Sequence, residues 1–188
     1  MSRPIVLQDI ELDRGLRLGL EALDFDQPTE VQQLAIPAAL AGQDLRITAE
    51  TGSGKTLAYL LPAAQRILAA TPDRNAGALL LVLVPTRELA RQVLKNCRDL
   101  IAKTPLQAQA ITGGADFKYQ KSLLRKNPEI IVATPGRLLE HCEKRSADLA
   151  SLQTLVLDEA DRMLDMGFRE DVLKIAGYCG DRRQVVLL

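Results

Sequence analysis

The chain has 188 residues, of which 47% are hydrophobic, and its 24 basic side chains are balanced by 24 acidic ones, so the formal net charge is zero. This length and apolar content suit a single α/β domain with a sizeable buried core. The neutral charge excludes an overall positive field, so any contact with nucleic acid would need local basic clusters.

The three cysteines, Cys97, Cys142 and Cys179, lie far apart and form no Cys-x-x-Cys pair. This pattern fits a reducing compartment better than a disulfide framework or a zinc site. The N-terminus has no apolar signal region, and no apolar run reaches 18 residues. We therefore expect a cytoplasmic protein without a membrane span, and we interpret His141 as an ordinary residue on a helix surface.

The first two elements are predicted to be helices. Residues 1–23 would give an irregular start and then an amphipathic helix whose apolar side carries Leu12, Leu16, Leu20 and Leu23. Thr29 is the expected N-cap of a second helix, in which Pro37 would produce a kink or an end. The buried stripe of that helix would consist of Val31, Leu34, Ala35 and Ala38.

A glycine-rich stretch follows a short strand pattern at 44–48 and precedes an apolar helix pattern that begins near Leu57. Its glycines allow backbone N–H groups to face a phosphate at a helix N-terminus. Lys55 would reach the β- and γ-phosphates of ATP, and the Thr56 hydroxyl would ligate Mg²⁺. The alternative is a plain glycine-rich turn, since Ala49 replaces the first glycine of the general pattern. The whole predicted phosphate loop is Ala49, Glu50, Thr51, Gly52, Ser53, Gly54, Lys55 and Thr56.

The rest of the chain alternates strand and helix patterns. Short β-rich runs at 79–84, 108–112, 129–133, 154–157 and 184–188 are separated by helical patterns at 87–103, 116–126, 137–144 and 169–178. This alternation predicts right-handed βαβ units and therefore an α/β fold with three layers around a central, mainly parallel sheet. Because the chain stops in a predicted core strand, we expect it to be the N-terminal part of a longer protein.

An acidic cluster, Asp158-Glu159-Ala160-Asp161, follows the strand at 154–157. Ligands of parallel sheets bind at the carboxyl ends of the strands. Asp158 would hold Mg²⁺ there, and Glu159 would orient and deprotonate the attacking water. The alternative is a helix N-terminus that favours acidic residues.

The sequence resembles the DEAD-box ATP-dependent RNA helicases over nearly its whole length. The resemblance rests on the order and spacing of six motifs: Pro28-Thr29-Glu30-Val31-Gln32, Ala49–Thr56, Pro85-Thr86-Arg87-Glu88-Leu89-Ala90, Thr112-Gly113-Gly114, Thr134-Pro135-Gly136-Arg137 and Asp158–Asp161. It implies a RecA-like P-loop NTPase domain spanning 1–188, with 1–23 as a flanking segment. A second RecA-like domain of the same protein would follow, and Asp161 would couple the two domains.

The resemblance also assigns binding residues. Gln32 would read adenine with support from Thr29, and Phe25 would pack on the adenine ring, although Phe25 could equally be a helix-packing aromatic. Asp24 departs from the family, which usually has glycine at this position. RNA backbone contacts would come from Pro85, Thr86, Arg87, Gly113, Gly114, Thr134, Pro135, Gly136 and Arg137.

The predicted function is ATP hydrolysis, with Lys55, Asp158 and Glu159 as catalytic residues, coupled to local opening of RNA duplexes. ATP and Mg²⁺ would be the cofactors, and RNA would be bound by a monomer without sequence readout. A DNA helicase or translocase is one alternative, and a non-catalytic RNA-binding assembly module is another. Dependence on the ribose 2′-OH and an ATPase assay would discriminate these possibilities.

Overall fold

A computed structural model describes residues 10–25, 27–50, 52–70, 76–181 and 183–188. Its centre is a six-stranded sheet in the order β1-β6-β5-β2-β4-β3, in which every pairing is parallel. The strands are β1 (Leu45–Arg46), β2 (Leu80–Leu83), β3 (Ala108–Ile111), β4 (Ile130–Ala133), β5 (Thr154–Leu157) and β6 (Gln184–Leu187). All six lie within the ranges predicted from the sequence.

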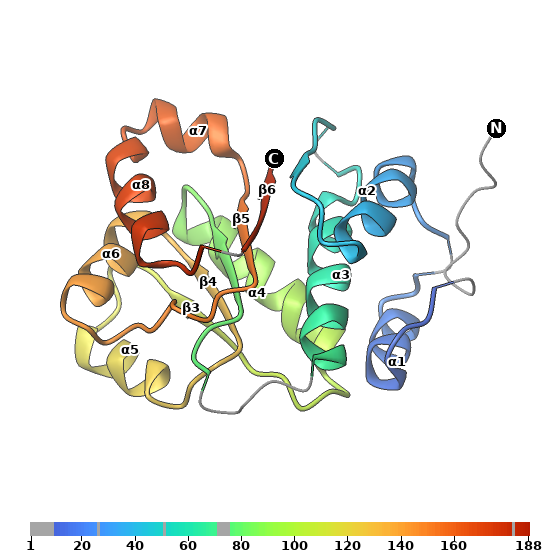
Figure 1. Ribbon diagram of the computed structural model, residues 1–188, viewed down its shortest axis with the longest axis horizontal. Coiled ribbons are helices and arrows are strands. Elements are labelled where there is room, and N and C mark those ends of the chain that lie inside the picture. The colour runs from blue at the N-terminus through green and yellow to red at the C-terminus, as the bar shows by residue number, and fades with distance from the viewer. Residues whose placement is uncertain (1–9, 26, 51, 71–75, 182) are drawn as a thin grey trace.

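Helices cover both faces of the sheet, which gives the three predicted layers (Figure 1). On one face lie α1 (Arg14–Ala22), α2 (Glu30–Leu40), α3 (Lys55–Ala69) and α4 (Arg87–Ile101); on the other lie α5 (Phe117–Leu124), α6 (Pro135–Glu143), α7 (Ala160–Asp165) and α8 (Arg169–Tyr178). Strand β2 is apolar at every position because both of its faces are buried. Leu80 and Val82 belong to the core cluster on the first face, whereas Leu81 and Leu83 belong to the cluster on the second.

Helix α1 packs on the C-terminal end of α4 through two glycines. A Cβ at Gly15 would meet the backbone of Lys103, and a Cβ at Gly19 would collide with the carbonyl group of Leu100. Leu16 and Leu20 are buried beside them, as the amphipathic pattern predicted. The first helix is thus an integral part of the fold, held by close backbone approach as well as by leucines.

Helix α2 differs from the sequence prediction. Leu34, predicted to be buried, is 73% exposed, and the buried residues are Gln32, Ala35, Ile36 and Ala39. The prediction is confirmed for Ala35 but was wrong for Leu34, because the first turn of α2 packs against the phosphate loop and buries the polar Gln32. Pro37 does not end the helix, which continues to Leu40.

The short helix α7 was not predicted, because six residues are too few for a periodic pattern. Within the described ranges, no helix combines the length and the apolar character needed to cross a membrane.

Candidate functional site

The predicted phosphate loop lies between β1 and α3, and its described part has the backbone conformation that a phosphate-binding loop requires. Gly52 and Gly54 have φ angles of 84° and 89°, in the left-handed region that favours glycine. Helix α3 begins directly after them at Lys55. Backbone N–H groups and the positive end of the helix dipole therefore meet at this point. Thr51, also assigned to the loop, lies outside the described residues.

The first turn of α2 clamps this loop from outside. Nε2 of Gln32 donates to the carbonyl oxygen of Gly54 at 2.9 Å, while Oε1 accepts from the backbone N–H of Thr29 at 2.9 Å. The Thr29 hydroxyl donates to the carbonyl oxygen of Ser53 at 2.7 Å. A Cβ at Gly54 would collide with the Gln32 amide, so this position requires glycine for contact as well as for φ.

Two polar side chains lie inside the loop. Nζ of Lys55 donates to the carbonyl oxygen of Ala49 at 2.6 Å, which places the ammonium group over the loop backbone. The loop is closed by a hydrogen bond from the Ser53 N–H to the carbonyl oxygen of Glu50 at 3.3 Å. Oγ of Ser53 is buried and finds no acceptor or donor among the described residues. A cationic group and an unsatisfied hydroxyl in a ring of amides suit an anionic ligand.

Asp158 directly follows β5 and is only 5% exposed. Its Oδ2 accepts a hydrogen bond of 2.8 Å from the hydroxyl of Tyr59, a fully buried residue of α3. Burial raises the pKa of Asp158, and the Tyr59 hydrogen bond opposes that rise. Burial also raises the pKa of Tyr59 well above its ordinary value, so Tyr59 is a permanent donor. Sequence reasoning missed Tyr59, although its place one turn after Lys55 on α3 was the available signal.

Thr56 and Asp158 are the predicted magnesium ligands. Thr56 lies in the first turn of α3, three residues before Tyr59, and the Tyr59 hydroxyl contacts Asp158. Because residues three apart lie on one side of a helix, Thr56 and Asp158 come from neighbouring parts of the loop and the end of β5. Mg²⁺ prefers such hard oxygen ligands and takes its remaining ligands from water and phosphates.

The turn after β5 carries a strained residue. Glu159 has φ 55° and ψ 51°, a left-handed conformation that costs a non-glycine residue about 1–3 kcal/mol. Its Oε2 accepts from Nη1 of Arg162 at 3.0 Å, and the exposed Asp161 accepts from the backbone N–H of Arg162 at 2.8 Å. The N–H of Ala160 donates to the carbonyl oxygen of Leu188 at 2.8 Å, which fixes the turn to the sheet.

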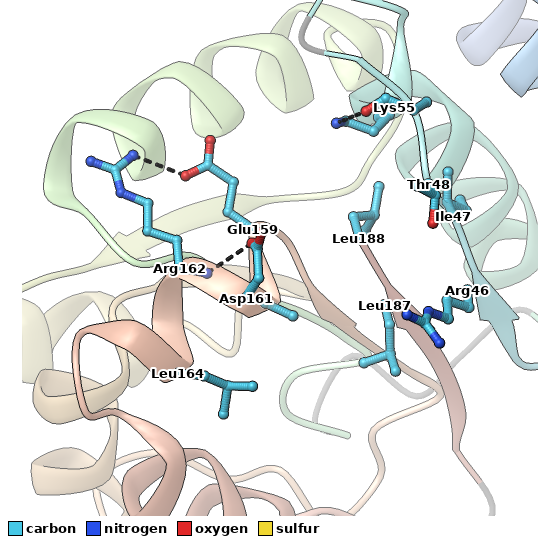
Figure 2. Close-up of a pocket in the computed structure, with 12 residues that line it drawn as sticks. Arg46, Ile47, Thr48, Lys55, Glu159, Asp161, Arg162, Leu164, Leu187 and Leu188 are labelled. Atoms are coloured by element: carbon cyan, nitrogen blue, oxygen red, sulfur yellow. Dashed lines mark hydrogen bonds and ion pairs between the residues drawn. The ribbon is translucent and has the colours of Figure 1, made fainter.

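A cavity of about 670 Å³ separates the loop from this turn. Figure 2 shows Lys55 on one side and Glu159, Asp161 and Arg162 on the other, with Leu187 and Leu188 between them. Its size suits a nucleotide-sized ligand. The cavity is also lined by Arg46, Ile47, Thr48, Ala49, Ala160 and Leu164. Asp158, Thr29, Gln32 and Phe25 are not among the lining residues.

The region predicted to bind adenine explains one departure from the family. Asp24 has φ 52°, a conformation that glycine adopts without cost and that aspartate tolerates better than most residues. Phe25 is half-buried and packs against the core cluster that contains α1 and α2. Gln32 uses one amide hydrogen on the Gly54 carbonyl oxygen and one oxygen lone pair on the Thr29 N–H, so one donor and one lone pair of the amide are left over.

The predicted RNA-binding residues follow β2, β4 and β3, three neighbouring strands, and so lie along one edge of the sheet. Thr86 caps α4 by accepting from the Leu89 N–H at 3.2 Å. The Arg87 guanidinium lies over Gly113 and Gly114, and a Cβ at Gly114 would have to displace it. We call the segments 85–87, 113–114 and 134–137 the basic rim.

The last segment of the basic rim begins α6. Thr134 is the N-cap, and Pro135 occupies the first turn, followed by Gly136. Nη1 of Arg137 donates to the carbonyl oxygen of Ala115 at 2.8 Å, and its Nε lies 3.2 Å from Oε2 of Glu140. The structure thus brings all three predicted segments together on one edge.

One interpretation is wrong. His141, taken as a helix surface residue, is completely buried, and its ring stacks on that of Phe117. The pattern of α6 gave no signal for this, because the partners of His141 lie on α5, about 20 residues away.

Comparisons with known proteins agree with this geometry. Residues 29–188 match the DEAD/DEAH box helicase family. The chain is 44% identical to the ATP-dependent RNA helicase SrmB of Escherichia coli over 95% of its length, and 41% identical to the probable ATP-dependent RNA helicase DDX27 of Mus musculus over 99%. Bacterial and animal relatives are therefore about equally similar to it.

The chain spans 40% of the E. coli relative and 24% of the mouse relative. The crystal structure of a DEAD box protein from the hyperthermophile Methanococcus jannaschii superposes with a TM-score of 0.88 at 33% identity, covering 97% of this chain and 49% of that one. The RecA-like fold is thus shared with a DEAD-box protein. The chain belongs to the DEAD/DEAH box helicase family.

Proposed function

We propose that this chain is the ATP-binding domain of an ATP-dependent RNA helicase, which binds ATP with magnesium and contributes to RNA-stimulated hydrolysis and local duplex unwinding. One observation carries the proposal: Lys55 and Glu159 face one cavity from opposite sides, and the basic rim lies on the same edge of the sheet. The curated relatives described above are named as ATP-dependent RNA helicases, which supports it further.

Triphosphate binding would use the loop and Lys55. On binding, the Lys55 ammonium would exchange the Ala49 carbonyl oxygen for phosphate oxygens, a stronger charge-assisted partner. The Gly52–Gly54 amides would take the remaining phosphate oxygens. Gln32 and Thr29 would keep the loop in place during binding, because their contacts reach its carbonyl groups and use none of its N–H groups.

Thr56 and Asp158 would hold the magnesium ion, which neutralises charge on the β- and γ-phosphates. Asp158 keeps Oδ1 for this purpose, because Oδ2 is bound by Tyr59. The Tyr59 hydrogen bond also orients the buried carboxylate and opposes the rise that burial causes in its pKa.

Glu159 would orient the attacking water and accept its proton. In the structure its carboxylate is paired with Arg162, an exposed contact of 3.0 Å that is weak enough to exchange. Glu159 lines the cavity, and breaking the Arg162 contact would free its carboxylate to turn toward the phosphates. Asp161, on the exposed side of the turn, would couple this site to a second RecA-like domain.

The basic rim would hold single-stranded RNA by its phosphates. Arg87 and Arg137, with the amides of the glycine turn and of the α6 N-terminus, offer charge-assisted hydrogen bonds that carry no sequence information. Other basic side chains of α4 are already paired, Arg91 with Glu88 and Lys95 with Asp99. Binding should therefore be weak in the isolated chain and strongly dependent on salt.

Titration calorimetry of the chain with MgADP and MgATP tests the nucleotide site. Lys55→Ala should abolish triphosphate binding, whereas Lys95→Ala, on the exposed face of α4, should leave it unchanged. Circular dichroism would establish that both variants are folded. Equal affinity in Lys55→Ala and in the parent would refute the site assignment.

Fluorescence anisotropy with RNA and DNA strands of one sequence tests the substrate class. We expect tighter binding to RNA, and in the longer protein an ATPase rate that RNA stimulates and DNA does not. Equal stimulation by DNA would favour a DNA translocase. A complete lack of turnover in the longer protein, with RNA bound, would favour a non-catalytic module.

A further inference from the structure

A buried amide lies behind the basic rim. Gln120, on α5, is only 2% exposed, and its side chain contacts three residues that lie in two other segments. Its Nε2 donates to the carbonyl oxygen of Thr112 at 2.7 Å, directly before the glycine turn. Its Oε1 lies 3.3 Å from Nη1 of Arg137 and 3.2 Å from Nε2 of His141. One amide thus joins the loop after β3 to two residues of α6.

The proton positions in this cluster follow from the chemistry of the partners. A carbonyl oxygen only accepts hydrogen bonds and a guanidinium only donates them. The nitrogen of the Gln120 amide must therefore face Thr112, and its oxygen must face Arg137. The Nε2 atom of His141 faces the same oxygen and must therefore carry a hydrogen. In the neutral ring, Nδ1 is then an acceptor that faces the Ser146 hydroxyl at 2.9 Å, and the single hydrogen of that hydroxyl is shared with the His141 carbonyl oxygen at 3.1 Å.

The His141 ring is held rigidly in this orientation. It stacks on Phe117 with the ring centres 4.1 Å apart and the planes 6° from parallel. The ammonium group of Lys144 lies 4.4 Å from the centre of the Phe117 ring. The position of the His141 ring is therefore fixed by stacking on one side and by hydrogen bonds at both ring nitrogens.

The same cluster restrains Arg137, whose side chain is 18% exposed. Its Nη1 is shared between the Ala115 carbonyl oxygen and Gln120, and its Nε contacts Glu140. These contacts fix the plane of the guanidinium. Nη2 is the nitrogen for which the described residues offer no acceptor.

We propose that Gln120 and His141 are positioning residues for RNA: they lock the Arg137 guanidinium and the loop 112–115 into one rigid unit that presents Nη2 and the glycine-turn amides to the RNA backbone. This inference rests on the proposed function, because it assumes that the basic rim binds RNA. Neither residue touches the RNA. Their contribution is to remove the freedom that Arg137 and the loop would otherwise lose on binding.

Three variants separate positioning from simple packing. His141→Phe keeps an aromatic ring against Phe117 but removes the Nε2 donor, and His141→Gln restores a donor at about the same distance from the backbone. Gln120→Leu removes all three contacts of the amide. Ser122→Ala, on the exposed side of α5, is the matched control.

Fluorescence anisotropy with labelled single-stranded RNA at low salt is the first measurement. We expect His141→Phe and Gln120→Leu to weaken binding about three- to tenfold, which corresponds to the cost of ordering one flexible side chain on binding. His141→Gln should recover part of the affinity, and Ser122→Ala should match the parent. Affinity for MgADP should be unchanged in all four variants. The phosphate loop follows β1, which is the outer strand on the opposite side of the sheet from β3.

The second measurement uses the fact that the chain has one histidine, so its ring signals in an NMR spectrum need no assignment. The ¹⁵N shifts should show a neutral ring protonated on Nε2, and RNA should move these signals although the ring is buried. In Arg137→Ala the RNA-induced movement should disappear.

Unchanged RNA affinity in folded His141→Phe and Gln120→Leu would overturn the inference. If Gln120→Leu does not fold, His141→Phe and its His141→Gln partner decide the question alone. Unchanged RNA affinity in Arg87→Ala and in Arg137→Ala would instead refute the basic rim itself, and with it the proposed RNA site.

Discussion

The hydrogen bond between Tyr59 and Asp158 gives a prediction whose size follows from the structure. Tyr59→Phe removes one hydroxyl and leaves Oδ2 of a carboxylate that is 5% exposed without its donor. Hydrogen bonds to charged groups contribute about 1.5–3 kcal/mol. The substitution keeps the ring and so creates almost no cavity. We therefore expect the free energy of unfolding to fall by about 1.5–3 kcal/mol.

Urea unfolding without nucleotide and Mg²⁺ would measure this change. For a chain of this size the same loss lowers Tm by about 2–4 °C per kcal/mol, or roughly 3–12 °C in total. Tyr119→Phe is the control, because Tyr119 is 60% exposed and should change stability by less than about 0.5 kcal/mol. MgADP affinity should also fall in Tyr59→Phe only, since Oδ1 loses its orientation. Equal stability of the two variants would show that Asp158 does not depend on Tyr59.

Three further predictions concern other parts of the chain. In the longer protein, Glu159→Gln should bind nucleotide normally but slow RNA-stimulated hydrolysis by about 10² or more; a turnover within about twofold of the parent would assign Glu159 another role. Gly19→Ala should cost about 1–3 kcal/mol of stability in chemical unfolding by overpacking α1 on α4, whereas Gly177→Ala, with open space around it, should be neutral or stabilising. Burial lowers the pKa of His141 below 6.5. The positive charges of Arg137, Lys144 and Lys121 lower this pKa further, and the negative charge of Glu140 opposes them. The unfolded chain therefore takes up a proton first, and stability should fall as the pH drops below about 6.5, but not in His141→Phe; a series of unfolding curves between pH 5 and 8 would detect it.

The strands and most helices could be predicted from the sequence, because a strand covered on both faces needs apolar residues at every position. The run at 79–84 is the clearest case, since its alternate residues enter two different core clusters. The phosphate loop and the Asp158–Asp161 turn were equally accessible. Their chemistry depends on residue types at short, fixed spacings along the chain.

Contacts between distant segments could not be predicted in this way. Leu34 looked like a core residue, but the first turn of α2 turns toward the phosphate loop and buries Gln32 instead. His141 looked like a surface residue because its partner Gln120 lies 21 positions away on another helix. In each case a polar side chain is buried because its hydrogen bonds are satisfied by groups that the local pattern does not contain.

The order of the strands places the Asp158–Asp161 turn between the two predicted ligand sites. The phosphate loop follows β1 and the basic rim follows β2, β4 and β3, while the turn follows β5, which pairs with β2. Because Leu83 and Leu157 are register partners, the residues leading to Arg87 and to Glu159 leave the sheet side by side. The arginine proposed to hold RNA and the glutamate proposed to orient water therefore follow adjacent strands of one parallel sheet.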